Sequence, residues 1–396
     1  MDIKTLFYVC CLIYTSGCVT SAELQSSWSG LKETRRIRCR PWPKLESTLE
    51  TRHLRFLAGP KSSYVLSEGR SRDLQKAVHI AIGNPFKVTE GSLTQLPWGN
   101  EDHFVGELVH EAALLILVQS WVDGVANLEL RDSDNAVRLR SAPLSKTFKD
   151  SRLVATQGGH WLVYKNQAGD VSLEDEPEQA ARLLLGPNKQ ITLGVPITSA
   201  SDADAFISSS TDTSPIVVGL AKKSEENPFG TFRIANTREG TAAPLETRFI
   251  LAPKKAVESW TATMREGVLH LAYVEGSSLL GTAELKLALI SITPPGKLLS
   301  QTSSTLGHTH SGQLAWLSDA TRLYLVVPRW LDQESTLAVY NTDQNGLTAL
   351  GNWGVFEEGT KFQSFFVDPQ GGSKGVITEP RSKLARNPNL CQLTAL

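Results

Sequence analysis

The chain has 396 residues, a length that allows two or three ordinary domains or one large repeat domain. Hydrophobic residues make up 41% of the chain, which is enough for a packed core and excludes a disordered protein. The 40 basic and 41 acidic residues leave a formal net charge of −1, and this balance excludes a general nucleic-acid binder.

Residues 1–22 are typical of a signal peptide. Leu6–Tyr14 is an apolar run that is too short to span a bilayer but fits the hydrophobic part of an export signal. Thr15–Cys18 resembles a bacterial lipobox, in which Cys18 would be lipidated, whereas Thr20–Ala22 is an ordinary small-residue cleavage site. We therefore expect an exported protein of the periplasm, the cell envelope or the extracellular space. An uncleaved N-terminal anchor is the alternative.

Two cysteines remain once the signal segment is set aside, and they lie near the two ends of the chain. An exported chain with only Cys39 and Cys391 left is a disulfide candidate. The bond would require the two ends to meet in space. The alternative is that the two thiols are unrelated.

Residues 23–50 are interpreted as an irregular, basic N-terminal tail, and residues 51–396 as the folded domain. The basic side chains of this tail surround one of the cysteines and are Arg35, Arg36, Arg38, Arg40 and Lys44. Such a cluster can contact phosphates or a membrane surface, but a solvated segment is the more common outcome.

Short apolar segments recur along the rest of the chain at nearly even spacing. Their central residues follow one another at intervals close to 50 and are Leu115, Val163, Val217, His270, Tyr324 and Val376. The pattern is clearest in Gln313–Val327, where two apolar strands flank a polar turn, which indicates a β-hairpin. Only two segments, 71–81 and 178–185, are candidates for short helices.

A period near 50 with room for about four short strands is typical of a β-propeller. A single four-stranded sheet cannot bury both of its faces, whereas sheets stacked in a closed ring bury the faces between neighbours. The sequence therefore predicts an all-β propeller with seven blades, six or eight being the alternatives. A pair of β-sandwiches is the competing fold.

The segment Ala315–Leu323, with the letters AWLSDATRL, resembles a phrase found in TolB-like and related exported, WD-type propellers. In that phrase a tryptophan is followed by serine or proline, aspartate and a turn glycine. Ala320 stands where the glycine is usual. The resemblance implies a propeller blade and carries no activity with it.

The usual catalytic motifs are missing from the sequence, including the nucleophile elbow, the zinc helix, the Walker loop and the dinucleotide fingerprint. His308 and His310 would point to one side of a strand and could hold a metal ion, with a third ligand from His160, Asp202 or Asp204. Glu101–His103 places carboxylates beside a histidine, which suits acid–base chemistry, although such a segment is usually plain surface.

Nine tryptophans are many for this length, and they occur about once per repeat, which suits packing between blades. Those near turns could instead stack on sugar rings, and they are Trp121, Trp330 and Trp353.

These observations together favour a non-catalytic, exported propeller that binds a protein or glycan partner. No cofactor is expected, and the membrane is contacted only through the possible lipid anchor. The alternative is a propeller enzyme of the glycosidase or lyase type, with acids and histidines at the channel mouth. A structural envelope lipoprotein is a third interpretation.

Overall fold

The structure is a computed structural model. It describes residues 37, 39–43, 48–59, 62–110, 113–144, 147–166, 177–186, 190–200, 204–209, 211–221, 227–238, 245–307, 314–318, 322–331, 334–343, 346–356, 360–368, 374–379 and 387–393.

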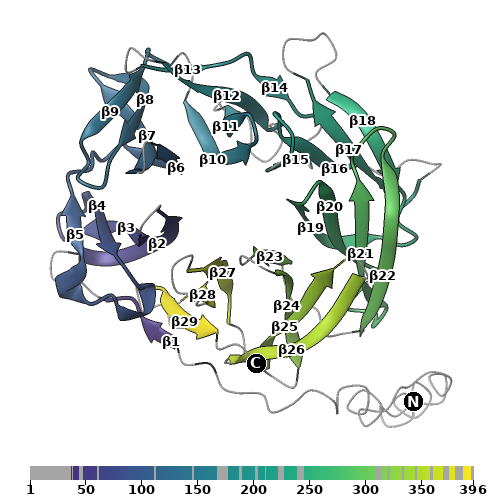
Figure 1. Ribbon diagram of the computed structural model, residues 1–396. Coiled ribbons are helices and arrows are strands. Elements are labelled where there is room, and N and C mark those ends of the chain that lie inside the picture. The colour runs from purple at the N-terminus through teal and green to yellow at the C-terminus, as the bar shows by residue number, and fades with distance from the viewer. Residues whose placement is uncertain are drawn as a thin grey trace, which may run out of the picture.

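The described strands form seven antiparallel units of four strands each, arranged as blades around a ring (Figure 1). Blade 1 consists of β2 (Thr48–Ala58), β3 (Ser63–Ser71), β4 (Lys76–Ile82) and β5 (Thr94–Leu96). Blade 2 consists of β6 (His103–His110), β7 (Ala113–Val122), β8 (Val125–Arg131) and β9 (Val137–Ser141). Blade 3 consists of β10 (Phe148–Thr156), β11 (Gly159–Asn166), β12 (Gln179–Leu185) and β13 (Gln190–Leu193), with the short β14 (Ile197–Thr198) beside β12.

The next three blades follow the same order. Blade 4 consists of β15 (Asp204–Ile207), β16 (Ile216–Ala221), β17 (Thr231–Thr237) and β18 (Leu245–Leu251). Blade 5 consists of β19 (Val257–Arg265), β20 (Val268–Glu275), β21 (Ala283–Ser291) and β22 (Lys297–Gly307). Blade 6 consists of β23 (Ala315–Ser318), β24 (Leu323–Leu331), β25 (Glu334–Asp343) and β26 (Gly346–Phe356), so the hairpin expected around Gln313–Val327 is confirmed as β23 and β24.

The ring is closed by strands from both ends of the chain. Blade 7 has the order β27 (Phe362–Val367), β28 (Lys374–Thr378), β29 (Asn389–Leu393) and then β1 (Cys39–Pro41) as its outer strand. Cys39 and Cys391 lie directly opposite each other in the pairing of β1 with β29, and the structure joins them by a disulfide. The two ends therefore meet, as the cysteine pattern predicts. The boundary placed at residue 51 cuts through β2, because β1 and the start of β2 belong to the ring.

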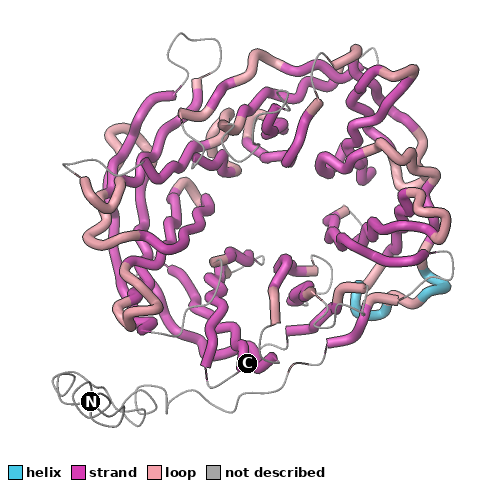
Figure 2. The backbone as a smooth tube through the Cα atoms, turned by 180° about the vertical axis from the view of Figure 1, so that it is seen from behind, coloured by secondary structure: helices cyan, strands magenta, loops and turns pink. Residues whose placement is uncertain are grey.

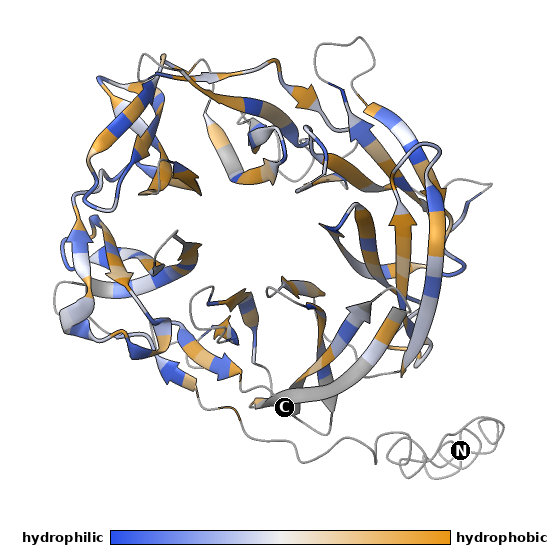
Figure 3. Ribbon diagram, in the orientation of Figure 1, coloured by the Kyte–Doolittle hydropathy of each residue, from blue (hydrophilic) through white to orange (hydrophobic). Residues whose placement is uncertain are grey.

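Seven hydrophobic cores fill the seven interfaces between neighbouring blades. Each cluster draws its buried side chains from two adjacent blades, including one between blade 7 and blade 1. Alternate residues of a central strand serve opposite interfaces: Leu162 packs against blade 2, whereas Val163 packs against blade 4. Central strands therefore carry apolar residues on both faces, and this explains the continuous apolar runs of the repeat; Figure 3 shows the apolar residues in orange along the strands.

Blades 2 and 3 share one sheet, because their outer strands β9 and β13 pair in parallel. The seven blades consequently form six hydrogen-bonded sheets. The first strand of each blade lies at the centre of the ring and the fourth lies at its perimeter (Figure 1).

The two expected helices are wrong. The segment 178–185 holds β12, and 71–81 holds a turn followed by β4. Both strands lie third in their blades, where pairing and burial on two faces override a weak helical pattern. The described helices are two short 3₁₀ turns, Pro85–Lys87 and Glu90–Ser92 (Figure 2), and none of the described helices is long and apolar enough to cross a membrane.

Candidate functional site

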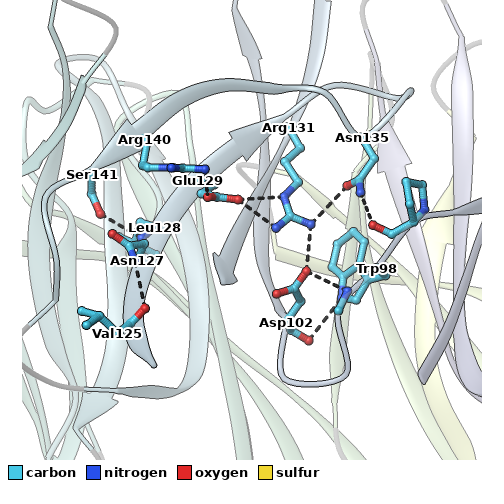
Figure 4. Close-up of polar contacts among 12 residues, drawn as sticks. Trp98, Asp102, Val125, Asn127, Leu128, Glu129, Arg131, Asn135, Arg140 and Ser141 are labelled. Atoms are coloured by element: carbon cyan, nitrogen blue, oxygen red, sulfur yellow. Dashed lines mark hydrogen bonds and ion pairs between the residues drawn. The ribbon is translucent and has the colours of Figure 1, made fainter. Parts of the chain in front are cut away.

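A heavily bonded polar group lies where the chain crosses from blade 1 to blade 2 (Figure 4). It consists of Trp98, Asp102, Glu129, Arg131 and Arg140, and we call it the linker cluster. The first two residues come from the connection between β5 and β6, and the other three come from β8 and β9. The cluster sits beside the apolar core between these two blades, because Trp98 is also part of that core.

Arg131 is the centre of the linker cluster. Its Nη1 donates to Asp102 at 2.9 Å, its Nη2 donates to Glu129 at 2.8 Å, and its guanidinium lies 5.5 Å from the centre of the Trp98 ring. Arg140 pairs with the other oxygen of Glu129 at 2.9 Å. The backbone N–H of Gly99 donates to Asp102 at 3.0 Å within the connection, and the contact of Asp102 with Arg131 fixes the connection to blade 2.

The linker cluster contains two carboxylates and two guanidinium groups, so its charges cancel and both acids are held in ion pairs. Glu129 is only 2% exposed. Asp102 is buried as well, whereas Glu101 and His103 on either side of it are exposed. Although the His103 side chain reaches solvent, partial desolvation by the groups around it lowers its pKa, and the neighbouring Lys76 lowers it further. The linker cluster holds two blades together and does not resemble an acid–base pair. The sequence also offers Glu101–His103 as plain surface, and this is wrong for Asp102, which is buried.

The same arrangement recurs at the entry to blade 4. Asp204 accepts a hydrogen bond from the backbone N–H of Ala200 at 2.9 Å and pairs with Arg233 at 3.4 Å. Asp204, Gly219 and Arg233 are direct neighbours across three strands. A Cβ atom at Gly219 would overlap the Asp204 carboxylate, so the glycine leaves the space in which the acid lies.

A third acid does the same at the entry to blade 5. Glu275, at the end of β20, accepts hydrogen bonds from the backbone N–H groups of Lys254 and Lys255 and lies 3.7 Å from the Lys286 ammonium group. The three acids therefore share one structural role, which is to bind the connection from the preceding blade. This role accounts for Asp204, which the sequence offers as a possible metal ligand.

The predicted metal site cannot be assessed, because His308, His310 and Asp202 lie outside the described residues. Within the described part of the chain, no group of three histidine, cysteine, aspartate or glutamate residues is placed to hold a metal ion. His160 is half-buried in β11, and burial lowers its pKa. The metal site stays a prediction, as does lipidation of Cys18, which also lies outside the described residues.

The three tryptophans expected to bind a ligand do not come from neighbouring blades. Trp121 lies in β7 of blade 2, and the backbones of Trp330 and Trp353 lie in β24 and β26 of blade 6. Trp121 is half-buried, and its indole Nε1 is buried without a hydrogen-bond partner in the part of the chain that is described. The side chains of the other two lie outside the description, so a role for these residues in ligand binding stays a prediction.

Arg55 and Glu107 lie on the inner strands of blades 1 and 2. The Arg55 guanidinium of β2 lies 4.6 Å from the centre of the Phe104 ring of β6. Burial raises the pKa of Glu107, and the positive charge of Arg55 acts in the opposite direction. Arg55 and Glu107 are charged groups on inner strands, as the enzyme alternative requires, and that alternative stays a prediction.

One rim of the ring carries half of the exposed large hydrophobic side chains in the described part of the chain. Strands alternate in direction, so the connections between blades and the turns from second to third strands lie on the same side. We call this side the linker rim. It carries six of the twelve exposed large hydrophobic side chains among the described residues, namely Leu74, Val125, Val195, Phe229, Leu279 and Leu280.

Leu279 and Leu280 are the most exposed of these side chains, at 90% and 77%. They lie in the turn between β20 and β21. Ser278 fixes this turn to the inner strand β19, because its backbone N–H and its hydroxyl each donate to the Glu258 carboxylate at 2.8 Å. The backbone N–H of Thr282 also donates to the Ser277 carbonyl at 2.9 Å, so the two leucines are held in solvent by a rigid turn.

Sequence reasoning missed this pair of leucines. A signal is nevertheless present: two large apolar residues stand between Gly276 and Gly281, in a segment whose flanking strands already account for the core. Gly276 has a φ of 103°, and a Cβ there would overlap the Thr282 carbonyl, which indicates a tight turn with its centre exposed.

The chain matches no protein-family model, and no curated protein sequence matches it. Solved structures resemble it in fold. The WD40 domain of SCAP from fission yeast is 10% identical and has a TM-score of 0.47, with 88% of this chain and 84% of that chain covered. The β-propeller domain of the trilobed protease from Pyrococcus furiosus is 8% identical and has a TM-score of 0.49, covering 88% of this chain and 96% of that one.

A protein from Lactobacillus plantarum is 14% identical, with a TM-score of 0.45 and coverage of 80% of this chain and 88% of that chain. These likenesses concern the fold alone. The propeller assignment rests on the seven blades and seven cores of this chain, and the narrower resemblance to TolB-like propellers stays a prediction.

Proposed function

We propose that the protein is an exported, non-catalytic propeller that binds a protein partner through its linker rim, in the cell envelope or outside the cell. The observation that carries this proposal is the pair Leu279 and Leu280, which a hydrogen-bonded turn holds in solvent. Single exposed apolar residues are ordinary, but two adjacent ones on a rigid turn, on a rim with four others, indicate a docking site.

The free energy available from burying the two leucine side chains supports docking of a protein. Complete burial of one leucine side chain contributes about 1.5 to 3 kcal/mol, so the pair would contribute about 3 to 6 kcal/mol. The turn is already fixed by the Glu258 hydrogen bonds, so little conformational entropy is lost when a partner covers it. Export is supported by the signal-like residues 1–22 and by a disulfide, a bond that is typical of oxidising compartments.

Site-specific photo-crosslinking in the source cells tests the proposal. A photoreactive amino acid replaces Leu280, and in a matched control it replaces Ile250, which is also exposed but lies on the perimeter strand β18. We expect a discrete crosslinked protein from position 280 and none from position 250. Equal patterns from both positions, or no protein product at all, would overturn the assignment of the linker rim.

Two further assays separate the other interpretations. Binding to a glycan array that is lost in Trp121→Ala but kept in a Leu279→Ser, Leu280→Ser variant would replace the protein partner by a glycan. Labelling with radioactive palmitate in the wild type and its absence in Cys18→Ala would establish the lipid anchor, and the lack of label in both would remove it.

A further inference from the structure

The outer strands of the blades differ in how well they are protected from pairing with another chain. An open strand edge is normally blocked by shortness, charge, proline or pairing. β5 has three residues, β9 and β13 pair with each other, and β1 carries a proline and the disulfide. β18 carries the ion pair of Glu246 with Arg248, and the pairing of β26 with β25 is interrupted twice.

β22 is neither short nor, among the described strands, paired at its outer edge, and it carries no proline. Its pairing with β21 is also interrupted twice, but it keeps a regular run of six residues, whereas the longest regular run of β26 has four. β22 has eleven residues, and Lys297 at its start is its only charged residue. Its pairing with β21 is regular from Ser300 to Thr305, and no other described strand pairs with its outer edge. The strand runs along the outside of the ring (Figure 1), so its free backbone groups face outward.

We propose that β22 is a self-association surface, at which a second copy of this chain adds its own β22 in antiparallel orientation about a two-fold axis at Thr302. Two four-stranded blades would then become one sheet of eight strands. Closed two-fold dimers of this kind are the most common form of homo-oligomer. The proposal concerns the perimeter, and it does not depend on the linker rim.

The sequence of β22 is complementary to itself in this register. Ser300 comes opposite Ser304 of the partner subunit, Gln301 opposite Ser303 of the partner subunit, and Thr302 opposite its own copy. Pairs of serine and threonine stabilise antiparallel strands through hydrogen bonds, and like charges are never opposed, because Lys297 comes opposite Gly307 of the partner subunit.

Two orphan hydroxyl groups also lie on this strand, and because their oxygens are covered within the single chain, a partner strand reaches them only after rotation about χ1. The Ser300 Oγ and the Thr302 Oγ1 are buried and have no hydrogen-bond partner in the described structure. Both side chains lie on the same face of β22, because alternate residues of a strand share a face. In the proposed pairing each of them faces a hydroxyl of the partner subunit on that same face, at the usual spacing of about 5 Å between Cβ atoms.

Sedimentation and light scattering of the purified full chain across a wide concentration range test the proposal. We expect a species of twice the chain mass. The exposed Ser303→Lys places a charge on the edge and should weaken self-association roughly tenfold or more. Thr247→Lys, on the exposed side of the charged strand β18, is the matched control and should have no effect.

Mixing Ser303→Lys with Ser303→Glu should restore a mixed dimer, which excludes misfolding as the cause. Hydrogen exchange gives a readout that needs no variant, because the outward amides between Ser300 and Ser304 should become protected as protein concentration rises. A monomer at every concentration, or an unaffected dimer in Ser303→Lys, overturns the proposal. The variant Leu279→Ser, Leu280→Ser should dimerise normally, so failure here and failure of rim docking are distinguishable.

Discussion

The disulfide between Cys39 and Cys391 should account for a large share of the stability of the ring. The bond spans 352 positions of the sequence, and it fastens a three-residue strand that would otherwise contribute only a few ladder hydrogen bonds. We expect the variant Cys39→Ala, Cys391→Ala to fold with a lower free energy of unfolding, because its unfolded chain regains the freedom of the open loop.

The chain-entropy relation for a loop of this length gives about 5 to 6 kcal/mol at room temperature, as an upper estimate. Other contacts that hold β1 in place reduce it, since Trp42 is buried in the core between blades 7 and 1 and its backbone N–H donates to the Pro388 carbonyl at 2.9 Å. The free energy of unfolding of a whole domain is about 5 to 15 kcal/mol, so even half of the entropy estimate is a large fraction of the total stability. A loss of this size lowers the melting temperature by about 5 to 10 °C.

Guanidinium unfolding of the oxidised protein, the reduced protein and the double alanine variant measures the effect. The reduced wild type is the control for side-chain volume, because Cys391 is fully buried and its replacement by alanine leaves a small cavity. The reduced protein and the variant should agree within about 1 kcal/mol and lie well below the oxidised protein. Equal midpoints for oxidised and reduced protein would refute the argument that the bond closes the ring.

Three other perturbations test the interior. Gly219→Ala should cost about 2 to 3 kcal/mol of stability, because its Cβ displaces the carboxylate of the blade 4 entry, whereas Gly91→Ala, with open space around it, should be neutral in the same denaturation experiment. Glu129→Gln should cost about 3 kcal/mol, because it leaves the guanidinium groups of the linker cluster without their buried partner; a midpoint unchanged within error would contradict this role. Burial lowers the pKa of His270 to about 4. The stability that the protein gains from keeping His270 neutral is therefore complete above pH 6.5 and is lost as the pH falls toward 4, so the free energy of unfolding drops by about 3 kcal/mol in total. An NMR titration midpoint of His270 near 6.5 would be inconsistent with this, and His270→Phe should flatten the dependence.

Much of the fold is readable from the sequence, because a propeller blade buries both faces of its central strands. Leu162 and Val163 are adjacent in sequence but serve different cores, which produces unbroken apolar runs at blade spacing. The cysteines at the two ends then predict closure. The closing strand itself could not be predicted, because Cys39–Pro41 is too short for a pattern and contains a proline.

The site was harder to predict, since it depends on contacts between blades. Asp102 resembles a surface residue in sequence, and its partner Arg131 is 29 positions away on a strand of the next blade. The ion pair exists only once the connection crosses the interface. The sequence places Leu279 and Leu280 in a turn, and the register of β20 with β21 confirms this, but their exposure is known only from the folded structure.

Several buried charges of this protein lie where the blades join, and this separates those internal contacts from the proposed external ones. Asp204, Glu275 and the linker cluster place their acids against nearby cations and backbone N–H groups within the ring. The linker rim near Leu280 and the strand β22, by contrast, offer apolar and uncharged groups. Because salt screens charges and leaves apolar burial and backbone hydrogen bonds nearly unchanged, binding at either surface should depend little on ionic strength. A steep loss of binding with added salt would place the partner site elsewhere, on the charged inner strands around Arg55.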